Sequence, residues 1–295
     1  MARPFRFGAV TSGLGSPEAW VGLARRAEEL GYSTLLMPDR PSMGGMAPIA
    51  ALTAAAMTTT RLRVGSYVFS NDYRHPAMLA KEAATLDLLS GGRFELGLGA
   101  GVGQPDYRQM GLSFDEAGTR VGRFEEALRI IKLMFTEDEV SFSGKYYTIE
   151  GMRGLPKPEQ KPHPPIVMGS SGKRMLTIAG READIIAPTP KFPRPGQPAD
   201  DVPLEEKIGW IREAAGERFA DIELAQTAYY IELTDAPTPI ATQPSGPPIP
   251  KRPMSTDQTV EHLEELRERY GFSYIQIFEA QLENFAPVIE RLVGR

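Results

Sequence analysis

The segment HPAMLAKEAATLDLLSGGRFELGLGAG, residues 75–101, decides the fold of this chain of 295 residues. Pro76 suits the first turn of a helix, where the backbone N–H that proline lacks has no partner in any case. Apolar or small residues then recur at helical spacing and predict about four turns with one buried face. That face consists of Leu79, Ala83, Leu86 and Ser90, widened by Met78 and Leu89.

A strand and a run of glycines follow this helix. Gly91 and Gly92 can adopt the left-handed conformation that ends a helix, and residues 93–99 then alternate as a strand. Glycine recurs at every second position from Gly97 to Gly103, which is the wrong spacing for a dinucleotide-binding fingerprint. We interpret these glycines as space for a planar ring or another backbone at the strand end.

The same alternation of strand and helix continues along the chain. Strands are predicted at residues 5–10, 32–37, 61–69, 93–99, 164–168, 184–187, 222–233 and 273–278. Capping boxes are expected at residues 113–116 and 255–258, each at the start of a helix. Eight strands in this order predict an α/β protein with a (β/α)8 TIM barrel, formed by residues 1–295 as a single domain.

Three segments interrupt the alternation, and the two proline-rich ones, which follow strands, are expected as insertions at the C-terminal face of the barrel. Residues 139–163 read as a hairpin excursion, and residues 188–203 and 235–255 are rich in proline. Dense proline is incompatible with a helix or a central strand. The proline-rich segments are therefore either lids over an active site or disordered connectors.

Composition excludes several classes of function. The net charge of −5 argues against a general nucleic-acid binder, which needs a basic face. The chain has no cysteine, so thiol catalysis and disulfides are excluded, and a cytoplasmic location is expected. No apolar run reaches membrane-spanning length, and the three histidines are too far apart to predict a metal site.

Polar residues and glycines follow the predicted strands, where a barrel places its active site. They are Thr11, Ser12, Asp39, Arg40, Ser70, Asn71, Gly101, Gly103, Ser170, Ser171, Thr189 and Glu279. This set is consistent with a small-molecule pocket, and equally with strand ends that simply meet water. Asp39, Arg40 and Asn71 are the candidates for catalysis. Asp39 either bonds a heterocycle N–H or forms a surface ion pair, as its neighbour Arg40 suggests.

A compact anion site is predicted where the fifth strand meets its helix. Gly169, Ser170, Ser171, Gly172 and Lys173 offer small residues, hydroxyl groups and a charge at a helix N-terminus, which favours a phosphate. The alternative is an ordinary serine cap with glycine nearby. His75, which precedes Pro76, is interpreted as a cap or packing residue rather than a base.

The chain resembles the bacterial luciferase-like flavin- and deazaflavin-dependent oxidoreductases. The resemblance is carried by RHPAMLAKEAATLDLLSGGRFELGLGAG (74–101), RFEEALRI (123–130) and PPIVMGSSGKRMLTIAGREADII (164–186), and the text is most similar to members that use coenzyme F420. It implies a barrel, a homodimer, a ring bound at the barrel mouth and a non-proline cis peptide near Phe69 and Ser70. The implied cofactor contacts are Asp39, Phe69, Ser70, Gly101, Val102, Gly169, Ser170, Ser171, Gly172 and Lys173.

The resemblance implies hydride transfer between F420 and a small organic substrate. The alternatives are an FMN-dependent monooxygenase and a non-catalytic cofactor-binding barrel. Arg40 stands where many relatives have a histidine, and Val102 with Gly103 where some have a glutamate, so an alcohol dehydrogenase mechanism is in doubt. Arg40, with Arg74 and Lys173, is a candidate to meet an anionic substrate or the acidic tail of the cofactor.

Overall fold

The structure is a computed structural model that describes residues 2–13, 15–43, 45–191, 200–236 and 251–295. The chain divides into two compact units. The first unit comprises Met1–Thr11, Arg25–Leu35 and Met168–Arg295, and the second comprises Ser12–Ala24 and Leu36–Val167. The strands β2 (Thr34–Met37) and β8 (Ile166–Ser170) each have residues in both units.

The strands of the first unit are parallel neighbours. β1 (Arg6–Val10) pairs with β13 (Phe272–Phe278), which pairs with β10 (Glu223–Thr227), which in turn pairs with β9 (Ile185–Pro188). All five residues of β1 lie in register with β13, from Arg6 opposite Tyr274 to Val10 opposite Phe278. Because the strands are parallel, their carboxyl ends lie at one edge.

The strands of the second unit complete the topology. β5 (Phe94–Gly99) pairs with β3 (Arg63–Ser66), with the two-residue strand β4 (Phe69–Ser70) and with the start of β8. The order is β3-β2-β1-β13-β10-β9-β8-β5, with β3 also paired to β5. This is the order of a closed parallel (β/α)8 barrel, so the predicted fold class is confirmed.

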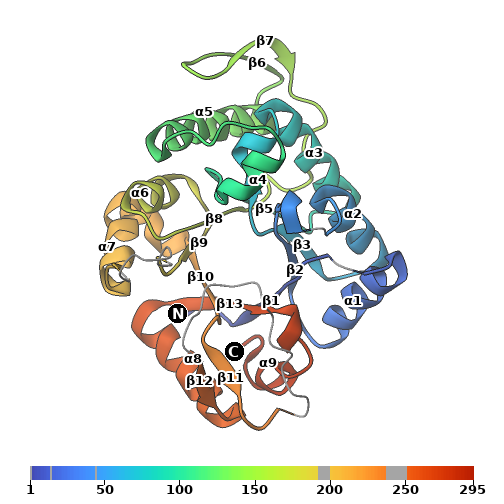
Figure 1. The fold of residues 1–295 in the computed structure, drawn as a ribbon, viewed down its shortest axis with the longest axis vertical. Coiled ribbons are helices and arrows are strands. Elements are labelled where there is room, and N and C mark those ends of the chain that lie inside the picture. Colours follow the sequence, from blue (N-terminus) through green and yellow to red (C-terminus); the bar gives the residue numbers. More distant parts are fainter. Residues whose placement is uncertain (1, 14, 44, 192–199, 237–250) are drawn as a thin grey trace. The chain divides into compact units, whose positions relative to one another are not determined.

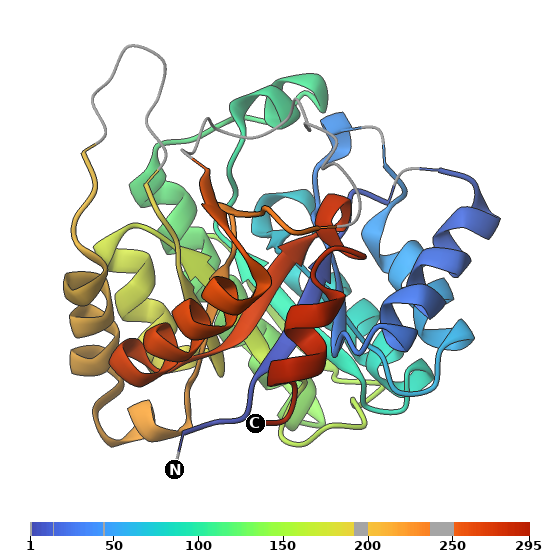
Figure 2. The same ribbon diagram turned by 90° about the horizontal axis from the view of Figure 1, so that it is seen from below.

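Helices alternate with the strands as predicted. They are α1 (Pro17–Glu29), α2 (Pro48–Thr58), α3 (Pro76–Leu89), α4 (Gln104–Gln109), α5 (Ala117–Thr136), α6 (Lys173–Glu182), α7 (Leu204–Ala215), α8 (Thr256–Tyr270) and α9 (Ala286–Leu292), with 3-10 turns at Pro41–Met43, Asn71–Tyr73, Gly216–Asp221 and Glu279–Gln281. In the first unit α6 and α7 lie side by side (Figure 1). There α8 and α9, the red helices of Figure 2, pack on each other, and α8 also contacts β13.

Helix α3 begins and ends as predicted, but its buried face differs in width. The His75 ring nitrogen Nδ1 accepts a hydrogen bond from the Ala77 amide at 3.3 Å, which confirms its capping role. Leu79, Ala83, Leu86 and Ser90 are buried, whereas Met78 and Leu89 are 51% and 50% exposed. The buried face widens instead toward Ala80, Ala84 and Asp87, because α3 packs between α2 and α5.

Two other local predictions are wrong for identifiable reasons. The predicted strand 222–233 is broken after Thr227, where the Tyr229 amide bonds back to the Thr227 carbonyl; β11 (Ile231–Leu233) then pairs with β12 (Arg252–Met254). The capping box predicted at residues 113–116 is not formed, because α5 begins only at Ala117, with Glu116 as its N-cap residue and no side-chain cap. The Asp115 carboxylate pairs with Arg123 at 2.9 Å. The capping box of Ser255 and Gln258 is confirmed.

The excursion after α5 is the predicted antiparallel hairpin, β6 (Glu139–Ser143) and β7 (Thr148–Arg153), at the top of Figure 1. The Glu126 carboxylate of α5 accepts hydrogen bonds from the amides of Lys145, Tyr146 and Tyr147, which fixes the turn to the helix. Of the proline-rich segments, residues 192–199 and 237–250 lie outside the described residues. The choice between lid and connector therefore remains a prediction.

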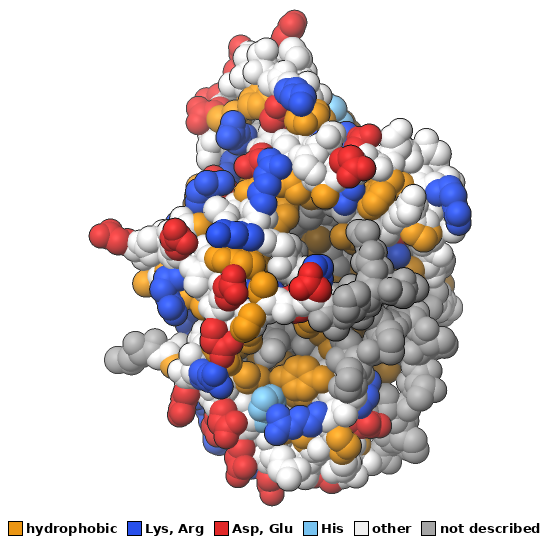
Figure 3. Space-filling view, turned by 60° about the vertical axis from the view of Figure 1, so that its left-hand side comes forward, with side chains coloured by type: hydrophobic (Ala, Val, Ile, Leu, Met, Phe, Trp, Pro, Cys, Tyr) orange, Lys and Arg blue, Asp and Glu red, His pale blue; other side chains and the backbone are white. Residues whose placement is uncertain are grey.

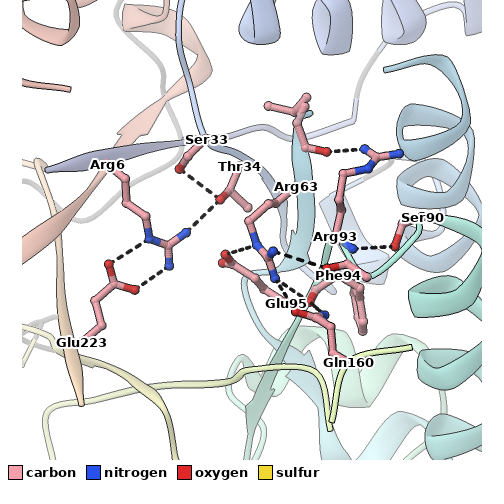
Figure 4. Close-up of polar contacts among 12 residues, drawn as sticks. Arg6, Ser33, Thr34, Arg63, Ser90, Arg93, Phe94, Glu95, Gln160 and Glu223 are labelled. Carbon is pink, nitrogen blue, oxygen red and sulfur yellow. Dashed lines mark hydrogen bonds and ion pairs between the residues drawn. The ribbon is translucent and has the colours of Figure 1, made fainter. Parts of the chain in front are cut away.

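Polar networks lie at the amino ends of the strands in both units (Figure 4). In the first unit the Arg6 guanidinium binds Glu223 through two bonds of 2.8 and 2.6 Å. In the second unit Arg63 binds the buried Glu95 at 2.8 Å and the Gln160 side chain at 3.0 Å. Pairing satisfies charges that would otherwise be costly to bury, so these networks stabilise the fold at the end remote from the strand mouths.

Candidate functional site

Asp39, at the end of β2, is buried and fully engaged. Its Oδ2 accepts from Arg74 Nη1 at 2.5 Å and from the Ser70 amide at 3.1 Å, and its Oδ1 accepts from Arg74 Nη2 at 3.1 Å. The prediction of a surface ion pair suggested by Arg40 is therefore wrong: the partner is Arg74, and the pair is buried. A forked pair of this kind is strong and directional. It connects β2 to β4.

Arg40 has a different partner, which the sequence did not single out. Its Nε donates to Oδ2 of Asp106 at 2.7 Å, and Oδ1 of Asp106 accepts from the Ser42 amide and hydroxyl at 3.0 and 2.5 Å. Asp106 is fully buried in α4. Burial alone would raise the pKa of Asp106, but the bonds from Ser42 and Arg40 hold it below its ordinary value. Asp106 was missed because a helix as short as α4 has no hydrophobic periodicity.

The non-proline cis peptide that the resemblance implied near Phe69 and Ser70 is present between β3 and β4, where it joins Tyr67 and Val68. Phe69 is buried, with the Arg74 guanidinium 5.1 Å from its ring centroid. Ser70 is also buried, and its amide donates to Asp39. These residues are therefore part of the ordered end of β4.

The chain itself occupies the space that the glycines leave. A Cβ atom at Gly97 would overlap the Ser66 carbonyl, and one at Gly101 would overlap the Tyr107 hydroxyl. At Gly99 it would lie 2.9 Å from the Val68 side chain. Packing within the chain therefore accounts for these three glycines, and the interpretation of the run as room for a planar ring stays a prediction. The alternative, close approach of other parts of the chain, is confirmed. The next residue, Val102, is 68% exposed.

Asn71 belongs to a network that reaches the hairpin. Its buried amide nitrogen donates to the Tyr147 hydroxyl and to Asp72, both at 3.3 Å. Asp72 also pairs with Arg123 through two bonds of 2.8 Å and accepts from the Tyr107 hydroxyl at 2.8 Å. Burial raises the pKa of Tyr147 above its ordinary value, so its hydroxyl stays protonated at neutral pH. The network orders the chain after β4.

In the first unit, the N-terminus of α6 has no side-chain cap. Gly172 is the N-cap residue, and its amide donates to the Ser170 hydroxyl at 3.1 Å. A Cβ at Gly169 or Gly172 would meet nothing closer than 3.6 Å, so packing within the described chain does not require glycine there. Ser171 is half-buried and Lys173 is exposed, with the Lys173 ammonium 5.6 Å from the Trp210 ring centroid. The backbone donors of this turn are available to an anion.

Other predicted strand-end residues of the first unit meet in pairs. The Thr11 hydroxyl donates to Glu279 at 2.5 Å, and the Thr189 amide donates to the Ser170 carbonyl at 2.9 Å. Thr189 also lines a cavity of about 140 Å³ with the buried Lys207, which the sequence did not single out. The Lys207 ammonium binds the Thr189 carbonyl at 2.8 Å and Asp201 at 2.7 Å. The other carboxylate oxygen of Asp201 lies 2.6 Å from the ammonium, so its three N–H donors have three acceptor atoms close by.

Surface charge and metal ligands do not point to other sites. On the face drawn in Figure 3, acidic and basic side chains are interspersed rather than gathered in one basic stripe. Within the described residues, no group of histidine and carboxylate side chains is placed to hold a metal ion. No helix among them is long and apolar enough to cross a membrane.

Comparison with known proteins shows the family to which the chain belongs. The sequence profile of the luciferase-like monooxygenases matches residues 1–234. The chain belongs to the luciferase-like monooxygenase family. It is 33% identical over 175 residues to an F420-dependent glucose-6-phosphate dehydrogenase of Amycolatopsis mediterranei, a match that covers 57% of this chain and 52% of the relative. The matched region thus spans about half the length of that relative.

Two further comparisons bear on the cofactor and on the fold. An FMNH(2)-dependent dimethylsulfone monooxygenase of Pseudomonas putida is 31% identical over 167 residues, covering 55% of this chain and 46% of that protein. The F420-dependent tetrahydromethanopterin reductase of Methanopyrus kandleri superposes with a TM-score of 0.78 over 98% of both chains, at 21% identity. This structural likeness shows that the chain has the same barrel fold as that reductase.

Proposed function

We propose that this protein is an oxidoreductase that transfers a hydride between C5 of coenzyme F420 and a small organic substrate. The observation that carries the proposal is the uncapped N-terminus of α6, with glycines that internal packing does not require. Such a turn fits a phosphate group, which F420 carries. Relatives named F420-dependent glucose-6-phosphate dehydrogenase favour F420 over other phosphorylated cofactors.

In this proposal the cofactor phosphate is held by Gly169, Ser170, Ser171, Gly172 and Lys173. The amides after Gly172 and the two hydroxyl groups donate to the phosphate, and Lys173 adds positive charge. The bound cofactor would supply the centre that accepts or donates the hydride. The chain's part is to bind and orient.

The ring contacts are proposed for Asp39, Phe69, Ser70, Gly101 and Val102. Because Arg74 and the Ser70 amide hold Asp39 in one position, its carboxylate would act as a fixed negative group and not as a mobile base. Asn71 is likewise held, by Tyr147 and Asp72, so we propose that it positions the end of β4. Neither residue is then required to shuttle a proton.

An FMN-dependent monooxygenase is the second candidate function. It is favoured by the dimethylsulfone monooxygenase relative, and FMN also carries a phosphate that would fit α6. A cofactor-binding barrel without catalysis is a third, weaker candidate. For each candidate we propose a homodimer, and we propose a cytoplasmic location because the chain lacks cysteine.

Titration of the purified protein with F420 and, separately, with FMN tests the proposal through tryptophan fluorescence. The two tryptophans report different places: Trp210 faces Lys173, whereas Trp20 is buried and bonds the Ala51 carbonyl at 2.8 Å. We expect F420 to quench the emission with higher affinity than FMN. Trp210→Phe should remove most of the change, and Trp20→Phe should leave it.

The possible results separate the three candidates. Tighter binding of FMN, with oxygen uptake by the reduced complex, would make the monooxygenase the better assignment. Tight binding of F420 without turnover of any substrate in a broad screen would favour the non-catalytic barrel. If neither cofactor binds, the cofactor assignment is wrong and only the fold remains.

A further inference from the structure

The Arg40 guanidinium is held through Nε, while its two terminal nitrogens remain available for a ligand. Its Nε is bonded to Asp106 Oδ2 at 2.7 Å, while Ser42 occupies Asp106 Oδ1 with two hydrogen bonds. Asp106 therefore has no second oxygen free for the usual forked pairing with a guanidinium. Within the described part of the chain, Nη1 and Nη2 of Arg40 donate to no acceptor.

The residues around Arg40 hold its guanidinium in this orientation and leave it partly exposed to solvent. The missing side chain of Gly103 makes room for the guanidinium, since a Cβ there would lie 3.2 Å from Nη2 and 3.3 Å from Cζ. The Arg40 side chain is 36% exposed, whereas its anchor Asp106 is fully buried. A guanidinium fixed by a buried carboxylate loses little further freedom when it binds an oxyanion through Nη1 and Nη2.

We infer that Arg40 receives the carboxylate or phosphate group of the substrate, which makes organic anions the substrate class. The inference rests on the proposed function, in which Asp39 and Val102, the immediate neighbours of Arg40 and Gly103, contact the cofactor ring. Arg74 does not compete for this role because Asp39 occupies it. The guanidinium of Arg40 offers N–H donors and no acceptor atom, so it is suited to binding an anion.

The test measures affinity of the F420-loaded protein for matched pairs of small probes by calorimetry. The probes are crotonate with crotonamide and benzoate with benzamide, which differ in charge but little in shape. We expect the wild type to prefer each carboxylate over its amide by about 10- to 100-fold. Arg40→Gln should reduce this preference to about twofold or less. Arg108→Gln, which removes an exposed charge from α4, should keep it.

The acidic tail of the cofactor is the competing anion, and a second titration distinguishes it from substrate. Wild type and Arg40→Gln are titrated with F420 and with the same deazaflavin lacking phosphate and tail. Equal affinities of the two proteins for both forms support a substrate anion. A loss of F420 affinity in Arg40→Gln alone, with the tailless form unaffected, would assign Arg40 to the tail and overturn the inference. A carboxylate preference that survives in Arg40→Gln would also overturn the inference, and so would a wild type that shows no carboxylate preference.

Failure of the wild type to bind F420 would instead count against the proposed function, and the probe titration on the unloaded protein would still test Arg40.

Discussion

At the scale of single residues, Gly97 is a position with little tolerance for change. A Cβ there would overlap the Ser66 carbonyl and lie 2.9 Å from the Val68 side chain. Because Ser66 ends β3 and Val68 directly precedes β4, and both strands pair with β5, these neighbours cannot move independently of the sheet. We expect Gly97→Ala to lower the free energy of unfolding by at least about 2 kcal/mol, as overpacked core substitutions do.

Gly22→Ala is the matched control for this prediction. Gly22 lies inside α1, where an added Cβ meets nothing within 4 Å, so the substitution should stabilise the protein by about 0.5–1 kcal/mol. Urea denaturation followed by circular dichroism measures both variants. Equal stability of the two variants would contradict the steric role assigned to Gly97.

The sequence predicted where a residue lies in the fold better than it predicted which side chains that residue contacts. Asp39 lies at a strand end as the sequence indicates, but its partner Arg74 is 35 positions away. Arg40 likewise finds Asp106, 66 positions along the chain. Periodicity and capping patterns report on neighbours within a helical turn. Side-chain pairs across a barrel depend on the strand order and register, which no local pattern contains.

At the scale of elements, helix stability and phosphate binding favour different residues at the start of α6. A carboxylate at the N-cap position would accept a hydrogen bond from the first turn and complement the helix dipole. Gly172→Asp should therefore leave stability unchanged or raise it by up to about 1 kcal/mol. The same carboxylate repels a phosphate, so we expect the affinity for F420 to fall at least about tenfold.

The tailless deazaflavin, which lacks the phosphate, is the control ligand for Gly172→Asp and should bind the variant as it binds the wild type. Thermal unfolding and tryptophan fluorescence give the two readouts. A variant that binds F420 normally would place the phosphate somewhere other than α6. Loss of both ligands would point to a wider disturbance of the site.

The elements themselves were predictable wherever one physical cause dominates. The boundaries of α3 follow from Pro76 at its start and Gly91 at its end, both visible in the sequence. The segment 222–233 was read as one strand because its residues suit a strand throughout. The turn after Thr227 interrupts it because the Tyr229 amide finds its acceptor locally and not in the sheet.

At the scale of the whole molecule, the barrel could be predicted because eight apolar strands alternate with amphipathic helices, a pattern with few packing solutions. The position of the mouth residues followed from the same rule. The orientation of their side chains did not, since it depends on pairs such as Arg40 with Asp106 that only the folded chain brings together. The pattern therefore gives the location of a site more readily than its chemistry.

The surface of α2 and α3, which contact each other in the second unit, supports the proposal of a homodimer. A surface helix normally has one polar face, but α2 (PIAALTAAAMT) has no charged residue, and Met57, Met78, Leu88 and Leu89 are exposed on the two helices. We expect analytical ultracentrifugation of the wild type to show a dimer.

Met78 and Leu89 lie on one side of α3, eleven residues apart, so the double variant Met78→Glu with Leu89→Glu should be a folded monomer. Leu155→Glu, at an exposed leucine outside both helices, should leave the dimer intact. A wild-type monomer, or a double variant that still dimerises, would exclude this face as the interface.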